Sequence, residues 1–141
     1  MTSYDFKNLS LIYESMGNNT MSLNDIYGDI EYDIPESEAL YSAVDPEMGD
    51  TQIPIKTLSP DQLLGLTTYQ DDTTVFQAYK DFADGEQKRI VNHYKKNRNE
   101  LHENPIVINN NTALDGYHRI VAAILTKQSL KVLDISDISE V

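Results

Sequence analysis

Five consecutive residues near the end of the chain, Asp115-Gly116-Tyr117-His118-Arg119, combine side chains that suit a phosphate site. They stand between an asparagine run and the apolar stretch IVAAIL, at the start of an expected helix. A helix N-terminus offers unpaired backbone N–H groups and a partial positive charge, which stabilise an anion. Gly116 can adopt a positive φ and admit a phosphate close to the backbone, while the Arg119 fork matches two phosphate oxygens. The stretch therefore predicts an anion-binding corner.

Each residue of this corner also has an ordinary structural explanation. Asp115 could hold a divalent cation or a ribose hydroxyl, and could equally cap the helix or close the turn. His118 and Arg119 would either grip phosphate or serve as a capping or packing histidine and a structural salt bridge. Tyr117 is expected to stack on or beside the pocket. A catalytic role is the weaker alternative for Tyr117, because a phenol with an ordinary pKa of about 10 is a poor nucleophile at neutral pH. Asp115 and His118 are the candidate catalytic residues, and Asp115 is the candidate metal ligand.

Two strand and helix patterns precede the corner. Residues 53–58 predict a strand, after which Ser59 can cap a short helix that begins at Pro60. Apolar residues then recur at helical spacing from 74 to 101, with a break at Asp84-Gly85. We expect two helices joined by a tight turn.

The elements that position the corner follow directly. We expect a strand over 105–108 that is buried on both faces, because its apolar run is continuous and β-branched. A turn at 109–111, a short strand over 112–114, a helix over 118–127 and a final strand over 131–135 complete the order. The expected fold class is α+β, a small mixed sheet with packed helices.

The charge of the chain is large and uneven. The 141 residues include 23 acidic and 11 basic side chains, a net charge of −12, which argues against a general affinity for nucleic acid. Residues 1–55 hold 11 of the acidic residues and a single lysine. We therefore divide the chain into an acidic, partly extended N-terminal arm over 1–51 and a domain over 52–141.

The acidic arm shows little regular pattern. Residues 6–16 carry an apolar stripe typical of a short amphipathic helix, whereas 24–52 mix acids with isolated Ile and Tyr and show no sustained period. This arm is interpreted either as a solvated extension draped on the domain or as a partner-binding or DNA-mimicking arm.

Two further groups of charged residues leave alternatives open. The basic stretch KRIVNHYKKNR, residues 88–98, is either the solvated face of a helix, a local phosphate contact or a docking face for the acidic arm. Glu100, Glu103, Asp134 and Asp137 are spare carboxylates that would either form a solvated rim or complete a metal or general-base site.

The order of these patterns resembles the ParB/sulfiredoxin superfamily over residues 52–137. There, a Gly followed by polar residues opens a helix after a hairpin, as Gly-Glu-Arg-Arg in ParB-type partition proteins and Gly-Cys-His-Arg in sulfiredoxins. Gly116, His118 and Arg119 match the sulfiredoxin version. The resemblance implies a phosphate-binding corner used for ATP or CTP, and in some members phosphoryl transfer or the phosphodiester cleavage of ParB-like nucleases.

The chain also departs from both versions. Tyr117 stands where sulfiredoxins have their Cys, and the chain contains no Cys, so a sulfinic-acid reductase mechanism is not available. Only the second Arg of Gly-Glu-Arg-Arg is retained, and no helix-turn-helix follows before Val141. Site-specific DNA partitioning is therefore not expected.

Two functional hypotheses result. In the first, the corner formed by Gly116, Tyr117, His118 and Arg119 binds a nucleotide or another phosphorylated ligand, with Mg²⁺ held by Asp115 and a further carboxylate, and acts as a nuclease, NTPase or phosphotransferase. In the second, the domain is a non-catalytic interaction module that docks on a protein partner through residues 1–50. That role would suit a phage or mobile-element accessory or structural protein. With no Cys, no apolar leader and no membrane-spanning run, we expect a soluble cytoplasmic protein.

Overall fold

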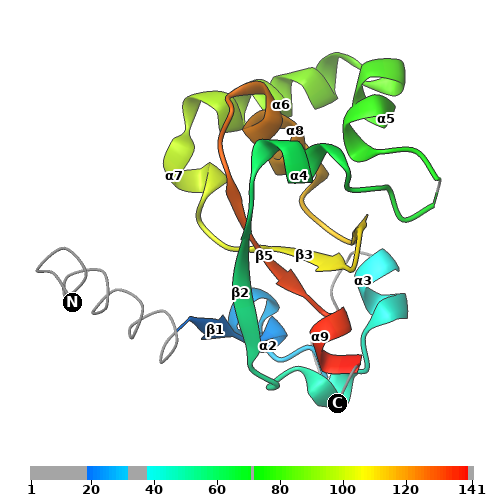
Figure 1. Cartoon of the computed structure of the whole chain (residues 1–141), viewed down its shortest axis with the longest axis vertical. Helices are drawn as coiled ribbons and strands as arrows, with labels where there is room; N and C mark the ends of the chain where they lie inside the picture. The colour runs from blue at the N-terminus through cyan, green and yellow to red at the C-terminus, as the bar shows by residue number, and fades with distance from the viewer. Residues whose placement is uncertain (1–18, 32–37, 71, 140–141) are drawn as a thin grey trace, which may run out of the picture.

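A mixed five-stranded sheet forms the centre of the fold in the computed structural model, which describes residues 19–31, 38–70 and 72–139 (Figure 1). The strand order is β1-β2-β5-β3-β4. Strands β3 and β5 are parallel, and every other neighbouring pair is antiparallel. The strands are β1 (Thr20–Met21), β2 (Ile53–Leu58), β3 (Ile106–Asn109), β4 (Thr112–Ala113) and β5 (Leu130–Asp134).

Helices cover both faces of this sheet. One layer contains α4 (Pro60–Leu64), α5 (Val75–Phe82), α6 (Gly85–Lys96), α7 (Arg98–Leu101) and α8 (Tyr117–Leu125). The opposite layer contains α2 (Leu23–Tyr27), α3 (Glu38–Ala43), the 3₁₀ turn η1 (Pro46–Met48) and α9 (Ser136–Ser139). We call it the N-terminal layer, because most of its elements come from the first third of the described chain, and we call its buried side chains the second core cluster. Figure 1 shows the two groups at opposite ends of the molecule. The mixed sheet and its packed helices confirm the expected α+β class.

The pleat of β3 and β5 divides the core into two clusters. Ile106 and Ile108 pack with α8 and the helices around it, whereas Val107, between them, packs with the N-terminal layer. Val132 and Leu133 of β5 divide in the same way. Successive side chains of a strand point to opposite faces, so both faces of these central strands are apolar. The prediction of a strand buried on both faces is confirmed.

Part of the acidic N-terminal segment packs against the sheet. Strand β1 pairs with β2, and Ser22 and Asp25 form a reciprocal capping box at the start of α2. Leu23, Ile30 and Leu40 are buried in the second core cluster. The amphipathic helix expected over 6–16 lies outside the described residues.

The helix boundaries follow local capping chemistry. The capping box of Ser59 and Gln62 is present, and the Asp84 side chain caps α6. The region from 74 to 101 holds three helices instead of the expected two, because the backbone leaves helical geometry at Asn97 before α7 begins. Helix α8 begins at Tyr117, one residue earlier than expected, because Gly116 serves as its N-cap. None of the described helices is long and apolar enough to cross a membrane.

Candidate functional site

A pocket of about 880 Å³ opens at the N-terminus of α8, and all five residues of the predicted corner line it. Most of the remaining wall comes from the N-terminal layer, the loop before α5, helices α5, α6 and α7, and the segment between α7 and β3. Six of the chain's 12 aromatic side chains contribute: Tyr27, Tyr69, Tyr79, Phe82, Tyr94 and Tyr117. The pocket is therefore large enough for a small organic ligand and is strongly aromatic.

Gly116 gives the corner its backbone shape. Its φ is +81°, in the left-handed region, and a Cβ at this position would lie 2.5 Å from Cγ2 of Ile106. Within the described residues, the backbone N–H groups of His118 and Arg119 have no hydrogen-bond acceptor. These two N–H groups belong to the first turn of α8, where the helix dipole favours an anion. The predicted helix start with open donors is therefore present.

Asp115 is fixed by two short hydrogen bonds. Its Oδ1 accepts from the backbone N–H of Gly116 at 2.7 Å, and its Oδ2 accepts from the Tyr27 hydroxyl at 2.6 Å. Burial raises the pKa of the Tyr27 hydroxyl, and the nearby negative charge of Asp115 raises it further, while Arg119 opposes the shift. Tyr27 therefore stays a protonated donor to the carboxylate.

The described residues around Asp115 do not supply a set of ligands for a metal ion. Among the described residues, no group of three or more His, Asp or Glu side chains is arranged to hold a metal ion. Both Asp115 oxygens already accept a hydrogen bond, as a turn-closing residue would. Its roles as a metal ligand and as a catalytic residue stay predictions.

Arg119 joins α8 to the segment before β3. Its Nη1 donates to the backbone carbonyl of Asn104 at 2.5 Å and makes a longer contact of 3.5 Å with the carbonyl of Leu101. Its Nη2 lies 3.7 Å from the position that a Cβ of Gly116 would occupy. No described carboxylate lies within ion-pair distance of this guanidinium. Nη1 therefore connects α8 to the segment before β3, and the other N–H groups of the guanidinium remain as donors beside the corner.

Tyr117 and His118 differ in how they are held. The Tyr117 hydroxyl accepts a hydrogen bond of 2.7 Å from the backbone N–H of Tyr69, which ties the loop before α5 to the corner. His118 is half-buried in the pocket wall, and no described residue hydrogen-bonds its imidazole. His118 is thus the titratable side chain of the corner that is free to contact a ligand.

The four spare carboxylates divide between two places. Glu100 and Glu103 line the pocket, where Glu100 pairs with His93 at 2.6 Å. Asp134 and Asp137 instead meet Lys56 on β2, with a shortest Lys56–Asp137 distance of 3.0 Å. The Asp134 carboxylate also accepts hydrogen bonds from Asn110 and Ser136. Only the first pair is therefore placed to meet a ligand of the corner.

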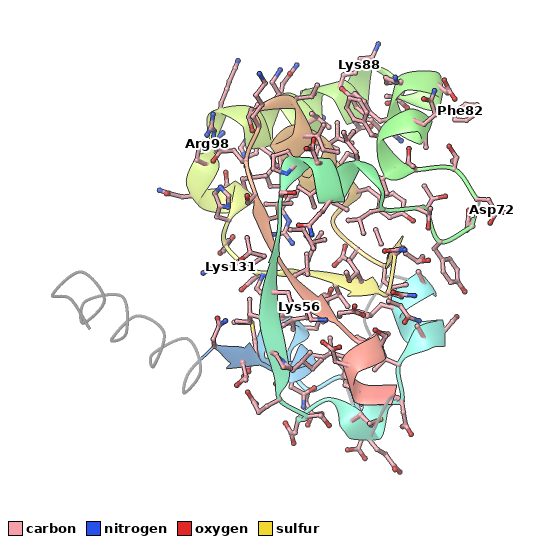
Figure 2. All side chains as sticks on the ribbon, in the orientation of Figure 1. Lys56, Asp72, Phe82, Lys88, Arg98 and Lys131 are labelled. Atoms are coloured by element: carbon pink, nitrogen blue, oxygen red, sulfur yellow. The ribbon has the colours of Figure 1, made fainter. Side chains whose placement is uncertain are left out.

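The basic side chains of residues 88–98 do not line this pocket, although Tyr94 of the same helix does. Lys88, Arg89 and Lys96 are exposed on α6, where they line a second, shallower hollow of about 450 Å³. Figure 2 shows Lys88 extending from α6 away from the rest of the fold. A solvated helix face accounts for this arrangement, and the docking of the acidic arm there stays a prediction.

Sequence reasoning missed most of the aromatic wall. Tyr79, Phe82 and Tyr94 appeared as apolar positions of helices, and nothing in their spacing indicates a ligand pocket. Tyr27 lies in a segment without periodicity, so no local signal connects it with Asp115.

Comparisons of the chain with protein-family models, curated proteins and solved structures found no match.

Proposed function

We propose that this protein binds a phosphorylated small molecule, and specifically a nucleotide, at the corner formed by residues 115–119. The observation that carries the proposal is the pocket of about 880 Å³ that all five residues line. One end of this pocket has the donors of a helix N-terminus, and much of the remaining wall is aromatic. A nucleotide combines a phosphate with a planar ring, which matches these two kinds of surface.

The phosphate end would use backbone and side-chain donors together. The N–H groups of His118 and Arg119 have no described acceptor, and Nη2 of Arg119 lies beside Gly116. Gly116 has no side chain to block the approach of phosphate oxygens to the backbone. Donors fixed in position by a helix and by a glycine turn need little reorganisation to bind an anion.

The ring end would use the aromatic side chains of α5 and α6. Tyr79 and Tyr94 are partly buried against the core and also line the pocket, so their positions are fixed by packing. Phe82 is 79% exposed at its rim, and Figure 2 shows it at the end of α5. Stacking of a base on an aromatic side chain contributes roughly 1–3 kcal/mol.

The resemblance of residues 52–137 to the ParB/sulfiredoxin superfamily supports the same assignment. It implies ATP or CTP as ligands and, in some members, phosphoryl transfer or phosphodiester cleavage as reactions. If the protein is an enzyme of this kind, His118 is the candidate for proton transfer, because its imidazole has no described hydrogen-bond partner. Asp115 would act by holding the turn, since both of its oxygens accept hydrogen bonds from the protein.

Binding is tested by calorimetry and thermal shift on the full chain with nucleotides and inorganic phosphate, each with and without Mg²⁺. A ligand present at 100 times its Kd adds about 2.7 kcal/mol to the free energy of unfolding. His118→Ala should weaken binding with little effect on folding, and His102→Ala, an exposed histidine outside the pocket, is its matched control. Equal affinities of the wild type, His118→Ala and Arg119→Ala would contradict the assignment to this corner.

The aromatic wall has its own test. Phe82→Ala should weaken nucleotide binding and leave the binding of inorganic phosphate unchanged, because only the nucleotide carries a ring. Leu125→Ala, which changes an exposed apolar residue outside the pocket, is the control. An equal loss of phosphate binding in Phe82→Ala would show that the wall does not act on a ring.

The second candidate, a non-catalytic interaction module, is favoured by one observation. Exposed acidic side chains gather in the described N-terminal layer: Asp25, Asp29, Glu31, Asp45, Glu47 and Asp50. Such a surface would bind a basic protein partner through complementary charge. A failure of every nucleotide and of inorganic phosphate to bind would favour this module over the nucleotide site.

A further inference from the structure

The charges around the pocket bear on how many phosphates its ligand carries. Among the described lining residues, the positive or potentially positive side chains are Arg119 and His118. Three carboxylates, from Asp115, Glu100 and Glu103, line the same pocket. The ranges outside the described residues contribute a single basic residue, Lys7. The pocket therefore holds more negative than positive charge.

The excess of negative side chains limits how many phosphate groups the ligand can carry. A phosphate monoester carries a charge of about −1.5 to −2 at pH 7, and each further phosphate adds negative charge. One guanidinium, one imidazole and the start of α8 can match a single phosphate group. A triphosphate would extend unmatched charge toward carboxylates, where like charges repel. It would have to bring its own counterion.

The lining carboxylates are poorly suited to supply that counterion's site. Asp115 uses both oxygens in hydrogen bonds with Gly116 and Tyr27. Glu100 is paired with His93 at 2.6 Å. Glu103 is exposed, and no hydrogen bond or ion pair joins its carboxylate to another described residue, although its backbone N–H donates to the Glu100 carbonyl. Asp115 and Glu100 are therefore engaged by protein groups and poorly placed to bind a cation. All three carboxylates still add negative charge to the pocket, which repels additional phosphates.

The volume shows that phosphate alone does not fill the pocket. A cavity of about 880 Å³ lies within the range that accommodates a drug-sized organic molecule. Tyr79, Phe82 and Tyr94 offer flat apolar surface, and the Gln87 and Asn104 side chains add amide donors and acceptors. A ligand with one phosphate and a hydrogen-bonding ring would use all of these surfaces.

From these observations we infer that the ligand is a nucleoside monophosphate, bound without Mg²⁺, in preference to a di- or triphosphate. This inference rests on the proposed nucleotide site and narrows its ligand class. The phosphate is placed at the Gly116 turn, and the base against the wall formed by α5 and α6. Glu103 disfavours longer phosphate chains through charge repulsion.

The test compares Kd values by calorimetry on the full chain, for the four common nucleoside monophosphates, the matching triphosphates and inorganic phosphate at constant ionic strength. Triphosphates are measured with and without Mg²⁺. At least one monophosphate should bind about tenfold or more tightly than its triphosphate under either condition, equivalent to about 1.4 kcal/mol. A triphosphate that binds as tightly or more tightly overturns the inference and leaves the nucleotide site standing. If no nucleotide or phosphate binds, the proposed function itself fails.

Reversal of one charge provides a second test, at an exposed position where the substitution should not disturb folding. Glu103→Lys should reduce the preference for the monophosphate over the triphosphate by about two- to fivefold, as expected for one partly screened charge. Glu47→Lys makes the same change at an exposed site outside the pocket and should leave the preference unaltered. An equal effect of both variants, or no effect of Glu103→Lys, would show that the pocket's charge does not select the ligand.

Discussion

The Tyr27 hydroxyl donates a 2.6 Å hydrogen bond to Asp115 Oδ2, across 88 positions of sequence. This bond joins the acidic N-terminal segment to the turn that opens α8. Because Asp115 also accepts from the Gly116 N–H, the shape of the corner depends on a residue far away in the sequence. The N-terminal layer is therefore part of the candidate site.

Removal of this hydroxyl should destabilise the fold. In Tyr27→Phe the Asp115 carboxylate loses one donor in a partly buried place, with an expected cost of about 1–2 kcal/mol in the free energy of unfolding. Urea unfolding measures this cost. Tyr79→Phe, whose hydroxyl has no hydrogen-bond partner among the described residues, should change the same quantity by less than about 0.5 kcal/mol. Equal losses in the two variants would mean that the Tyr27–Asp115 hydrogen bond does not contribute measurably to the free energy of unfolding.

The same bond predicts a dependence of stability on alkaline pH. Because the pKa of Tyr27 is raised in the folded state, the unfolded state loses this proton first as the pH rises. Its contribution is complete below about pH 10, the ordinary pKa of tyrosine, and declines above it by up to about 1.4 kcal/mol per pH unit. Unfolding curves of the wild type and Tyr27→Phe should therefore converge above pH 10. Parallel pH profiles would show that Tyr27 titrates alike in both states.

Gly116→Ala should distort or destabilise the corner. The φ of +81° and the 2.5 Å approach to Ile106 Cγ2 both act against a side chain, with a combined cost of at least about 2 kcal/mol. Gly28→Ala has the same φ but open space around it, so its cost should be about 1–2 kcal/mol. Gly85→Ala, which meets no atom within 4 Å and lies in α6, should be neutral or stabilising. Thermal unfolding of the three variants separates the close contact from the backbone strain.

The packing of the N-terminal layer is tested at Leu23. This side chain is fully buried in the second core cluster, so Leu23→Ala should cost about 2–5 kcal/mol in the free energy of unfolding. Leu64→Ala, at an exposed position of α4, should cost much less. A cost below about 0.5 kcal/mol for Leu23→Ala would indicate that this segment is only loosely attached.

Much of the local structure could be predicted from the sequence, because its signals act over a few residues. The Ser59 and Gln62 cap, the Asp84 break and the buried strand over 106–109 arise from capping chemistry and side-chain periodicity. The additional break at Asn97 was missed, since one asparagine within a helical pattern gives a weak signal. The start of α8 at the corner was visible because a glycine precedes an apolar run.

Local signals in the sequence were enough to predict the mixed α+β class, the order of the central elements and the phosphate-compatible residues at one helix start. Three features follow from the packed fold alone: the contact of Tyr27 with Asp115, the contact of Arg119 with the carbonyl of Asn104, and the aromatic side chains of α5 and α6 around the corner. Periodicity and capping record interactions between near neighbours in the chain. Contacts across 88 positions depend on how separate layers pack on the two faces of one sheet, and no local pattern contains that information.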